Sequence, residues 1–132
     1  MIKSRNIIQL SSSNDHTGFL FADGSVLILG NNDRGQCDPY DIEGCKVKQI
    51  SCGHKHTGLL MHDGSVRLFG SNVEGQCNIP PLNGYQVVQI SLGYAHTGLL
   101  LADGTVRIFG ENCYDQCDVP KLSNQRIIQI SL

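Results

Sequence analysis

The sequence predicts an all-β protein whose small antiparallel sheets stack radially as the blades of a β-propeller. Three observations lead to this prediction. The same residues recur at intervals of 40 positions without a gap, β-branched runs of strand length recur with them, and every repeat carries an Asp-Gly pair between two apolar runs. A fixed period of this size is typical of solenoids, propellers and other repeat arrays.

The chain of 132 residues has the length of a single domain. We expect one propeller fragment over 1–132, with repeats at approximately 10–49, 50–89 and 90–129. An extra copy of the repeat's first strand is expected at each end of the chain, at 7–11 and 127–131.

A β-branched run with the composition and length of a strand, such as 47–50 or 87–90, precedes each His-Thr-Gly sequence. An apolar run follows the His-Thr-Gly sequence, and a Val-centred run then ends in glycine. The Asp-Gly pair between these two runs predicts a hairpin with a type I′ turn, because Asp and Gly both tolerate positive φ. We therefore expect 97–101 to pair with 105–109.

A further segment of each repeat contains Gln-Cys with Pro39, Pro80 or Pro120 nearby. It fits a short outer strand, since proline is tolerated at the edge of a sheet. The repeat then supplies about four strands, apolar on both faces, and such a sheet cannot bury itself alone. Radial stacking covers both faces, which is the arrangement of propeller blades.

The pattern Gly-x-x-His-Thr-Gly-Leu-Leu-x-x-Asp-Gly-(Ser/Thr)-Val-Arg-(Leu/Ile)-Phe-Gly-x-Asn-x-x-Gly-Gln-Cys, best seen at 53–77, resembles the regulator of chromosome condensation (RCC1) repeat. The resemblance covers the whole chain and implies a β-propeller, usually seven-bladed, with four-stranded blades. The chain departs from the family pattern where Leu29, Phe69 and Phe109 stand in place of the typical Trp. The residues that carry the repeat signature are His16, His56, His96, Asp23, Asp63, Asp103, Gly24, Gly64, Gly104, Cys37, Cys77 and Cys117.

The histidines and the six cysteines raise the possibility of a metal site. Structural zinc sites usually draw four ligands from closely spaced pairs such as Cys-x-x-Cys, and the sequence has no such pair. The signature histidines occupy one position in successive blades, so we expect each imidazole to hydrogen-bond backbone at the entrance of its strand. We expect the chain to bind no metal and no cofactor.

Half of the cysteines follow the repeat, so we expect them to pack in the core rather than to form disulfides. Cys45, Cys52 and Cys113 lie outside the repeat register. Incidental thiols are the favoured interpretation, with a redox pair and chance substitution as alternatives. Together with the lack of a secretory signal pattern, this cysteine usage favours an intracellular protein.

The net charge of −2 disfavours binding to nucleic acid or to an anionic membrane through bulk electrostatics. The apolar stretches are far shorter than the roughly 18 residues of a membrane helix. Motifs typical of catalysis, including Gly-x-Ser-x-Gly, phosphate-binding Gly-rich loops with Lys and His-Glu-x-x-His, do not occur. We therefore expect no nucleic-acid partner, no membrane association and no enzymatic activity.

Partner-binding residues are expected where the repeats differ, because loops vary while packing holds the blade core. Tyr94 and Tyr114 lie in such loops and are of a type enriched at protein interfaces. His54 and Lys55 occupy the equivalent loop of the second repeat. An ordinary solvated loop aromatic is the slightly favoured interpretation of either tyrosine.

Three repeats do not close a ring, since propellers have about four to eight blades. Two open blade faces would present apolar sheet and unpaired edges. The leading hypothesis is a non-enzymatic protein-interaction scaffold in which two chains form a six-bladed ring, so that a homodimer is favoured. The copies at 7–11 and 127–131 would then compete for one position, whereas in a longer array the extra copy would simply be an overlap.

The family resemblance implies two alternative functions. One is a guanine-nucleotide exchange regulator of a small GTPase. The other is an inhibitor that binds an enzyme across the propeller face. Both would use another protein as a partner.

Overall fold

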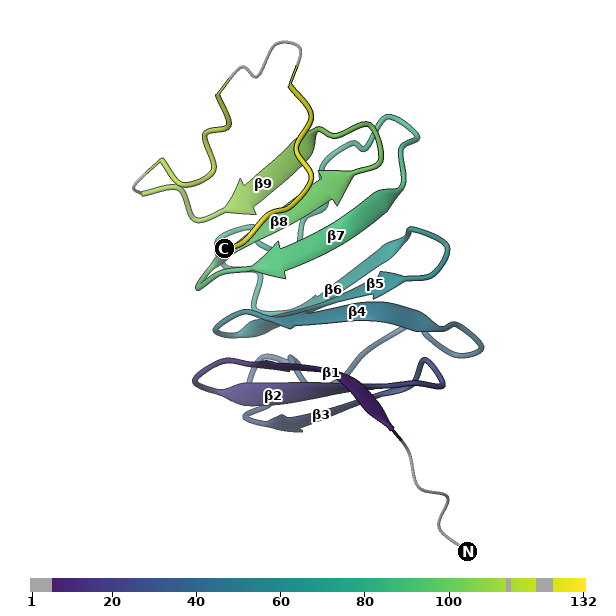
Figure 1. Cartoon of the computed structure of the whole chain (residues 1–132). Helices are drawn as coiled ribbons and strands as arrows, with labels where there is room; N and C mark the ends of the chain where they lie inside the picture. The colour runs from purple at the N-terminus through teal and green to yellow at the C-terminus, as the bar shows by residue number, and fades with distance from the viewer. Residues whose placement is uncertain (1–5, 114, 121–124) are drawn as a thin grey trace, which may run out of the picture.

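The computed structural model describes residues 6–113, 115–120 and 125–132, which form three antiparallel sheets stacked one behind the other (Figure 1). Each sheet has three strands in sequence order. Among the described residues, no helix is long and apolar enough to cross a membrane. We call the sheets blades 1, 2 and 3; their strands are β1 (Ile7–Ser12), β2 (His16–Phe21), β3 (Val26–Gly30), β4 (Val47–Cys52), β5 (His56–Met61), β6 (Val66–Gly70), β7 (Val87–Leu92), β8 (His96–Leu101) and β9 (Val106–Gly110).

The hairpin between the second and third strands forms in every blade, but its turn is not of type I′. Gly24 has φ +86°, whereas the preceding Asp23 does not have positive φ. The Gly24 N–H donates to the carbonyl of Phe21 at 2.9 Å, and the Asp23 carboxylate accepts the N–H of Ser25 at 2.9 Å. This forward bond from the Asp side chain stabilises a three-residue loop with only the glycine left-handed, so the predicted turn type is wrong.

The Gln-Cys segment, expected as an outer strand, consists of turns in each blade. In blade 1 the Asn32 side chain accepts the N–H of Cys37 at 2.8 Å and donates to Asp38 at 2.8 Å. Asn72 and Asn112 repeat both contacts in the other blades. Because the Asn side chain holds these groups locally, the segment stays folded on itself instead of joining the sheet.

The core lies between the blades. We call the face of a blade toward the preceding blade its front and the opposite face its rear. Leu20 and Ile28 on the rear of blade 1 pack against Ile50, Leu59 and Phe69 on the front of blade 2. The same arrangement joins the rear of blade 2 to the front of blade 3 through Leu60, Val66, Leu68, Val87, Ile90, Leu92, Leu99, Leu101 and Phe109.

Side chains of the first strand also link neighbouring blades. Gln9 Oε1 accepts the N–H of Ile50 at 2.8 Å, and Ser11 Oγ accepts the N–H of Cys52 at 2.9 Å. Gln49 and Ser51 make the same contacts to blade 3, both at 3.0 Å. Each first strand thus carries the hydrogen-bond partners of the next one.

Residues 127–132, which we call the terminal segment, repeat the first-strand sequence but are not part of any sheet. The segment runs along blade 3 (yellow in Figure 1), where Ile130 N–H donates to Gln89 Oε1 at 2.9 Å and Leu132 N–H donates to Ser91 Oγ at 2.8 Å. These contacts place it where the first strand of a following blade would lie. It is not the expected strand, because among the described residues no neighbouring strand pairs with its backbone.

Candidate functional site

The signature histidines connect adjacent blades through a relay of hydrogen bonds. His16 Nε2 lies 2.7 Å from Thr57 Oγ1, and the Thr57 hydroxyl donates to the carbonyl of Gln36 at 2.7 Å. In the next interface, His56 Nε2 lies 3.0 Å from Thr97 Oγ1, which donates to the carbonyl of Gln76 at 2.7 Å. Since the hydroxyl proton is used on the carbonyl, the imidazole Nε2 must carry the donated hydrogen.

Each of these contacts joins a histidine to a threonine 41 positions further along the chain. From the sequence, each imidazole was expected to hydrogen-bond backbone at the entrance of its strand, and this contact with a threonine hydroxyl was not predicted. The repeat contains both residue types, but only the stacking of blades brings a histidine next to the threonine of the following repeat.

Burial determines the charge state of the relay. His56 is completely buried, and desolvation lowers its pKa to about 4. Burial also lowers the pKa of His16 and of His96. Nδ1 of His56 has no hydrogen-bond partner among the described residues. These imidazoles are therefore neutral near pH 7, and those of His16 and His56 act as hydrogen-bond donors.

All six cysteines are free thiols. Those of the signature direct Sγ at a backbone carbonyl of their own loop, and Cys77 lies 3.3 Å from the carbonyl oxygen of Ser71. Burial raises the pKa of Cys77 and of Cys52 to about 11, so neither supplies a reactive thiolate at neutral pH. In the described part of the chain, no three His, Cys, Asp or Glu side chains gather as metal ligands would.

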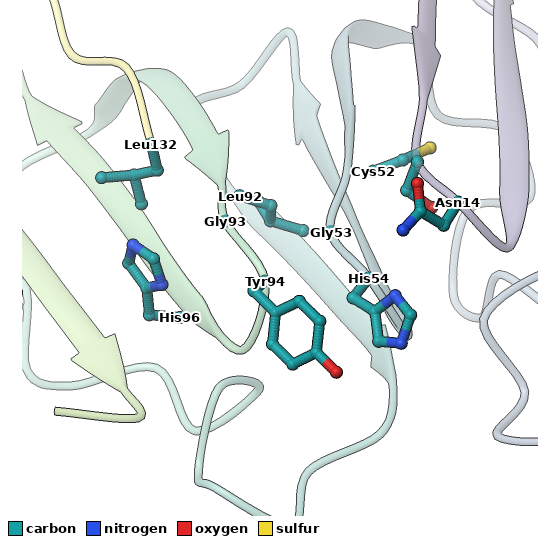
Figure 2. Close-up of a pocket in the computed structure, with 10 residues that line it drawn as sticks. Asn14, Cys52, Gly53, His54, Leu92, Gly93, Tyr94, His96 and Leu132 are labelled. Carbon is teal, nitrogen blue, oxygen red and sulfur yellow. The ribbon is translucent and has the colours of Figure 1, made fainter. Parts of the chain in front are cut away.

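The loops that precede β2, β5 and β8 lie beside one another and form a surface that we call the loop face. Here the ring of His54 stacks on Tyr94, with centroids 4.3 Å apart and planes inclined by 10° (Figure 2). His54 Nε2 also lies 3.9 Å from a carboxylate oxygen of Asp15. Three successive loops thus place Asp15, His54 and Tyr94 in a row.

Two cavities flank the stacked rings. One of about 330 Å³ is lined by Asn14, His54, Tyr94 and Leu132, and Figure 2 shows the side chains around it. The second, also about 330 Å³, includes Lys55 with Glu74 and Glu111. Tyr94 is 65% exposed. The structure therefore brings together three of the four expected partner-binding residues, while Tyr114 lies outside the described residues.

The front of blade 1 carries a second exposed surface, which the sequence analysis expected without identifying its residues. Leu10 is 60% exposed and Leu29 52% exposed. Their counterparts in blade 2, Ile50 and Phe69, are buried against blade 1. Ile7 and Leu27 are exposed on the same strands. The patch is found only by comparing the exposure of equivalent side chains in the three blades, which the sequence does not give.

On the other side of the molecule, the rear of blade 3 is only partly covered. A cavity of about 290 Å³ lies between β9 and the terminal segment. Val106 and Ile108 line it from β9, and Ile127, Ile130 and Leu132 line it from the segment. Blade 1 and blade 3 therefore present two different apolar surfaces that within this chain are not brought together.

Comparisons with known proteins agree with this architecture. Residues 87–116 match the family model of the regulator of chromosome condensation (RCC1) repeat. No curated protein sequence is similar enough to count as a relative of this chain.

Solved structures show the same fold. The crystal structure of Prp20p from Saccharomyces cerevisiae, described with its binding properties to Gsp1p and histones, is similar with a TM-score of 0.75 and 24% identity over 92% of this chain and 34% of that chain. Human WBSCR16 is similar with a TM-score of 0.74 and 23% identity, over 83% of this chain and 35% of that chain. The ectodomain of the receptor kinase CR4 from Physcomitrella patens is similar with a TM-score of 0.63 and 20% identity, over 83% of this chain and 31% of that chain. The chain spans about a third of the length of each.

Proposed function

We propose that this chain of RCC1-type repeats, which forms part of a β-propeller, acts as a non-enzymatic protein-interaction scaffold that assembles with itself. Blade 3 of each copy would pack on blade 1 of the other, so that two chains close a six-bladed ring. The observation that carries this proposal is the open front of blade 1, where Leu29 is exposed although its counterpart in blade 2, Phe69, is buried against a neighbouring blade.

The two end surfaces are complementary because they are the two halves of an interface that the chain already contains twice. The front of blade 1 offers Thr17, the counterpart of Thr57 and Thr97, and the rear of blade 3 offers His96, the counterpart of His16 and His56. In the ring, His96 of one copy would donate to Thr17 of the other. Burial of exposed apolar side chains such as Leu29 provides the driving force, at about 25 cal/mol per Å² of apolar surface.

Native mass spectrometry at micromolar concentration tests this proposal. We expect twice the mass of one chain for the natural sequence and the mass of a single chain for Leu29→Asp, since the ring would bury an unpaired carboxylate. Val73→Asp is the matched control, because Val73 is exposed on a loop away from the blade faces and should leave the dimer intact. A monomeric natural chain, or a Leu29→Asp variant that remains dimeric, would contradict self-assembly.

A second candidate function is binding of another protein at the loop face. The observation that favours it is the exposed stack of His54 and Tyr94 between two cavities. If the partner is a small GTPase, the chain should accelerate release of labelled GDP from at least one member of a GTPase panel, and Tyr94→Ala should reduce that acceleration. Unchanged release rates across the panel would rule out the exchange function for the GTPases tested.

A further inference from the structure

We propose that the terminal segment of one copy forms the inner strand of blade 1 in the other copy, in place of that copy's own β1. This inference rests on the proposed two-chain ring. In such a ring the terminal segment and β1 of the partner require the same position, which is the first strand of the blade that follows blade 3. Four observations favour the terminal segment.

First, the segment already occupies that position. A Cβ added to Gly98 would lie 2.9 Å from Leu132 Cδ1 and 3.4 Å from Ile130 Cδ1. A Cβ added to Gly58 would lie 3.0 Å from Leu92 Cδ1 and 3.3 Å from Ile90 Cδ1. The segment therefore packs on blade 3 as β7 packs on blade 2, and it would not need to move when a second copy arrives.

Second, its side chains suit a buried position better than those of β1. Ile130 and Leu132 are the same residues as Ile90 and Leu92, which are buried between blades 2 and 3. At the corresponding positions β1 carries Leu10 and Ser12. A serine at this place would bring a hydroxyl into an apolar contact, which is unfavourable unless the hydroxyl finds a partner.

Third, the exchange would conserve the hydrogen bonds that β1 makes to blade 2 of its own chain. Those bonds come from Gln9 and Ser11. Gln129 and Ser131 are the same residue types at the same spacing in the terminal segment, so they can accept the N–H groups of Ile50 and Cys52 in the partner copy. Neither copy loses a polar contact between first strands.

Fourth, the segment has the form of a strand that lacks a neighbour. Its backbone belongs to no sheet, and a cavity of about 290 Å³ separates it from β9. β2 of the incoming copy would pair with the segment in the register that joins β7 to β8, which is strand addition to an open edge. Leu29 of the incoming β3 would then approach the apolar residues that line the cavity.

Two substitutions at equivalent repeat positions, Leu10→Asp and Ile130→Asp, distinguish strand exchange from a ring in which β1 stays in place. If the terminal segment is donated, Ile130→Asp should raise the dissociation constant of the dimer at least about tenfold, whereas Leu10→Asp should leave it unchanged because β1 is outside the ring. The reverse result, equal weakening by both substitutions, or no weakening by either would overturn strand exchange.

Hydrogen exchange of the natural dimer provides a second measurement that does not depend on a variant that folds. We expect slow exchange of backbone amides within 127–132 and fast exchange within β1, while the opposite pattern would overturn the proposal. A natural chain that remains monomeric would instead contradict the ring itself, so failure of the proposed function can be told apart from failure of strand exchange.

Discussion

Thr57 satisfies two polar groups of the first blade at once, because its hydroxyl accepts from His16 Nε2 and donates to the carbonyl of Gln36. Both contacts are buried. Replacing Thr57 by Val keeps the shape of the side chain and leaves the imidazole N–H and the carbonyl without this partner. A buried polar group without its partner costs about 1–3 kcal/mol.

We therefore predict that Thr57→Val lowers the free energy of unfolding by about 2 kcal/mol or more. Urea unfolding monitored by circular dichroism measures this value, and the Leu29→Asp background removes any contribution from association. Thr17→Val is the matched control, because the same repeat position in blade 1 has no preceding blade within the chain. Equal losses for the two variants would show that the relay contributes nothing specific.

His56 makes stability depend on pH in a predictable direction. Burial lowers its pKa from 6.5 to about 4, so between these values the unfolded chain binds a proton that the folded chain does not. Its contribution to stability is complete above pH 6.5 and is lost as the pH falls toward 4, with a magnitude of up to ~3 kcal/mol.

We expect the free energy of unfolding to decrease between pH 7 and pH 4.5, and we expect His56→Gln to reduce that decrease. His62→Gln provides the control: His62 is exposed, and this variant retains the buried imidazole of His56. Urea titrations at several pH values measure the slope. If His56→Gln kept the slope of the natural chain, other groups would be responsible for it.

At the scale of the strand and the turn, the sequence predicted the hairpins well, because their contacts are local. The expected pairing of 97–101 with 105–109 is present, with Thr97 opposite Phe109 and Leu100 opposite Val106. The turn type and the outer strand were wrong because side chains compete with backbone patterns. Asp23 bonds forward to Ser25, and Asn32 bonds to Cys37 and Asp38, so local side-chain hydrogen bonds decide both conformations.

The glycine that ends the third strand tests how closely the elements approach one another. Gly70 has φ +110°, and an added Cβ would lie 2.5 Å from the carbonyl oxygen of Lys55 and 2.8 Å from His56 Cα, which are backbone atoms. Gly75 also has positive φ, at +78°, but an added Cβ would have no neighbour closer than Asn78 Nδ2 at 3.6 Å.

Gly70→Ala should therefore destabilise the chain much more than Gly75→Ala, whose cost is limited to about 1–2 kcal/mol of backbone strain. Thermal unfolding of both variants beside the natural chain measures the difference. Similar melting temperatures for the two variants would show that β5 and β6 can separate to admit a methyl group.

At the scale of the molecule, contacts between repeats could not be predicted from one repeat. The sequence placed His54 and Tyr94 in variable loops, but their stacking depends on how two blades pack against each other. The exposure of Leu10 and Leu29 has the same origin, since their counterparts Ile50 and Phe69 are buried in blade 2, which has a neighbour on its front. Period and composition predict the blade, while the position of a blade in the array determines which of its faces is available.

This dependence on position predicts a gradient of stability along the array. Blade 2 is covered on both faces by blades of its own chain, whereas the front of blade 1 is open. Residues with fewer buried contacts open more readily and exchange their amide hydrogens faster. In the Leu29→Asp variant, which we expect to be monomeric, amides of β5 should be the slowest to exchange and those of β2 should be faster.

Assembly should remove much of this gradient, because the ring would give blade 1 a neighbour on its front. We expect β2 amides to exchange more slowly in the natural chain than in Leu29→Asp, and β5 amides to change less, when both proteins are studied at the same micromolar concentration. Val73→Asp should match the natural chain. If β2 and β5 responded equally to Leu29→Asp, the substitution would act through global stability, and the front of blade 1 would not be the surface that a second copy covers.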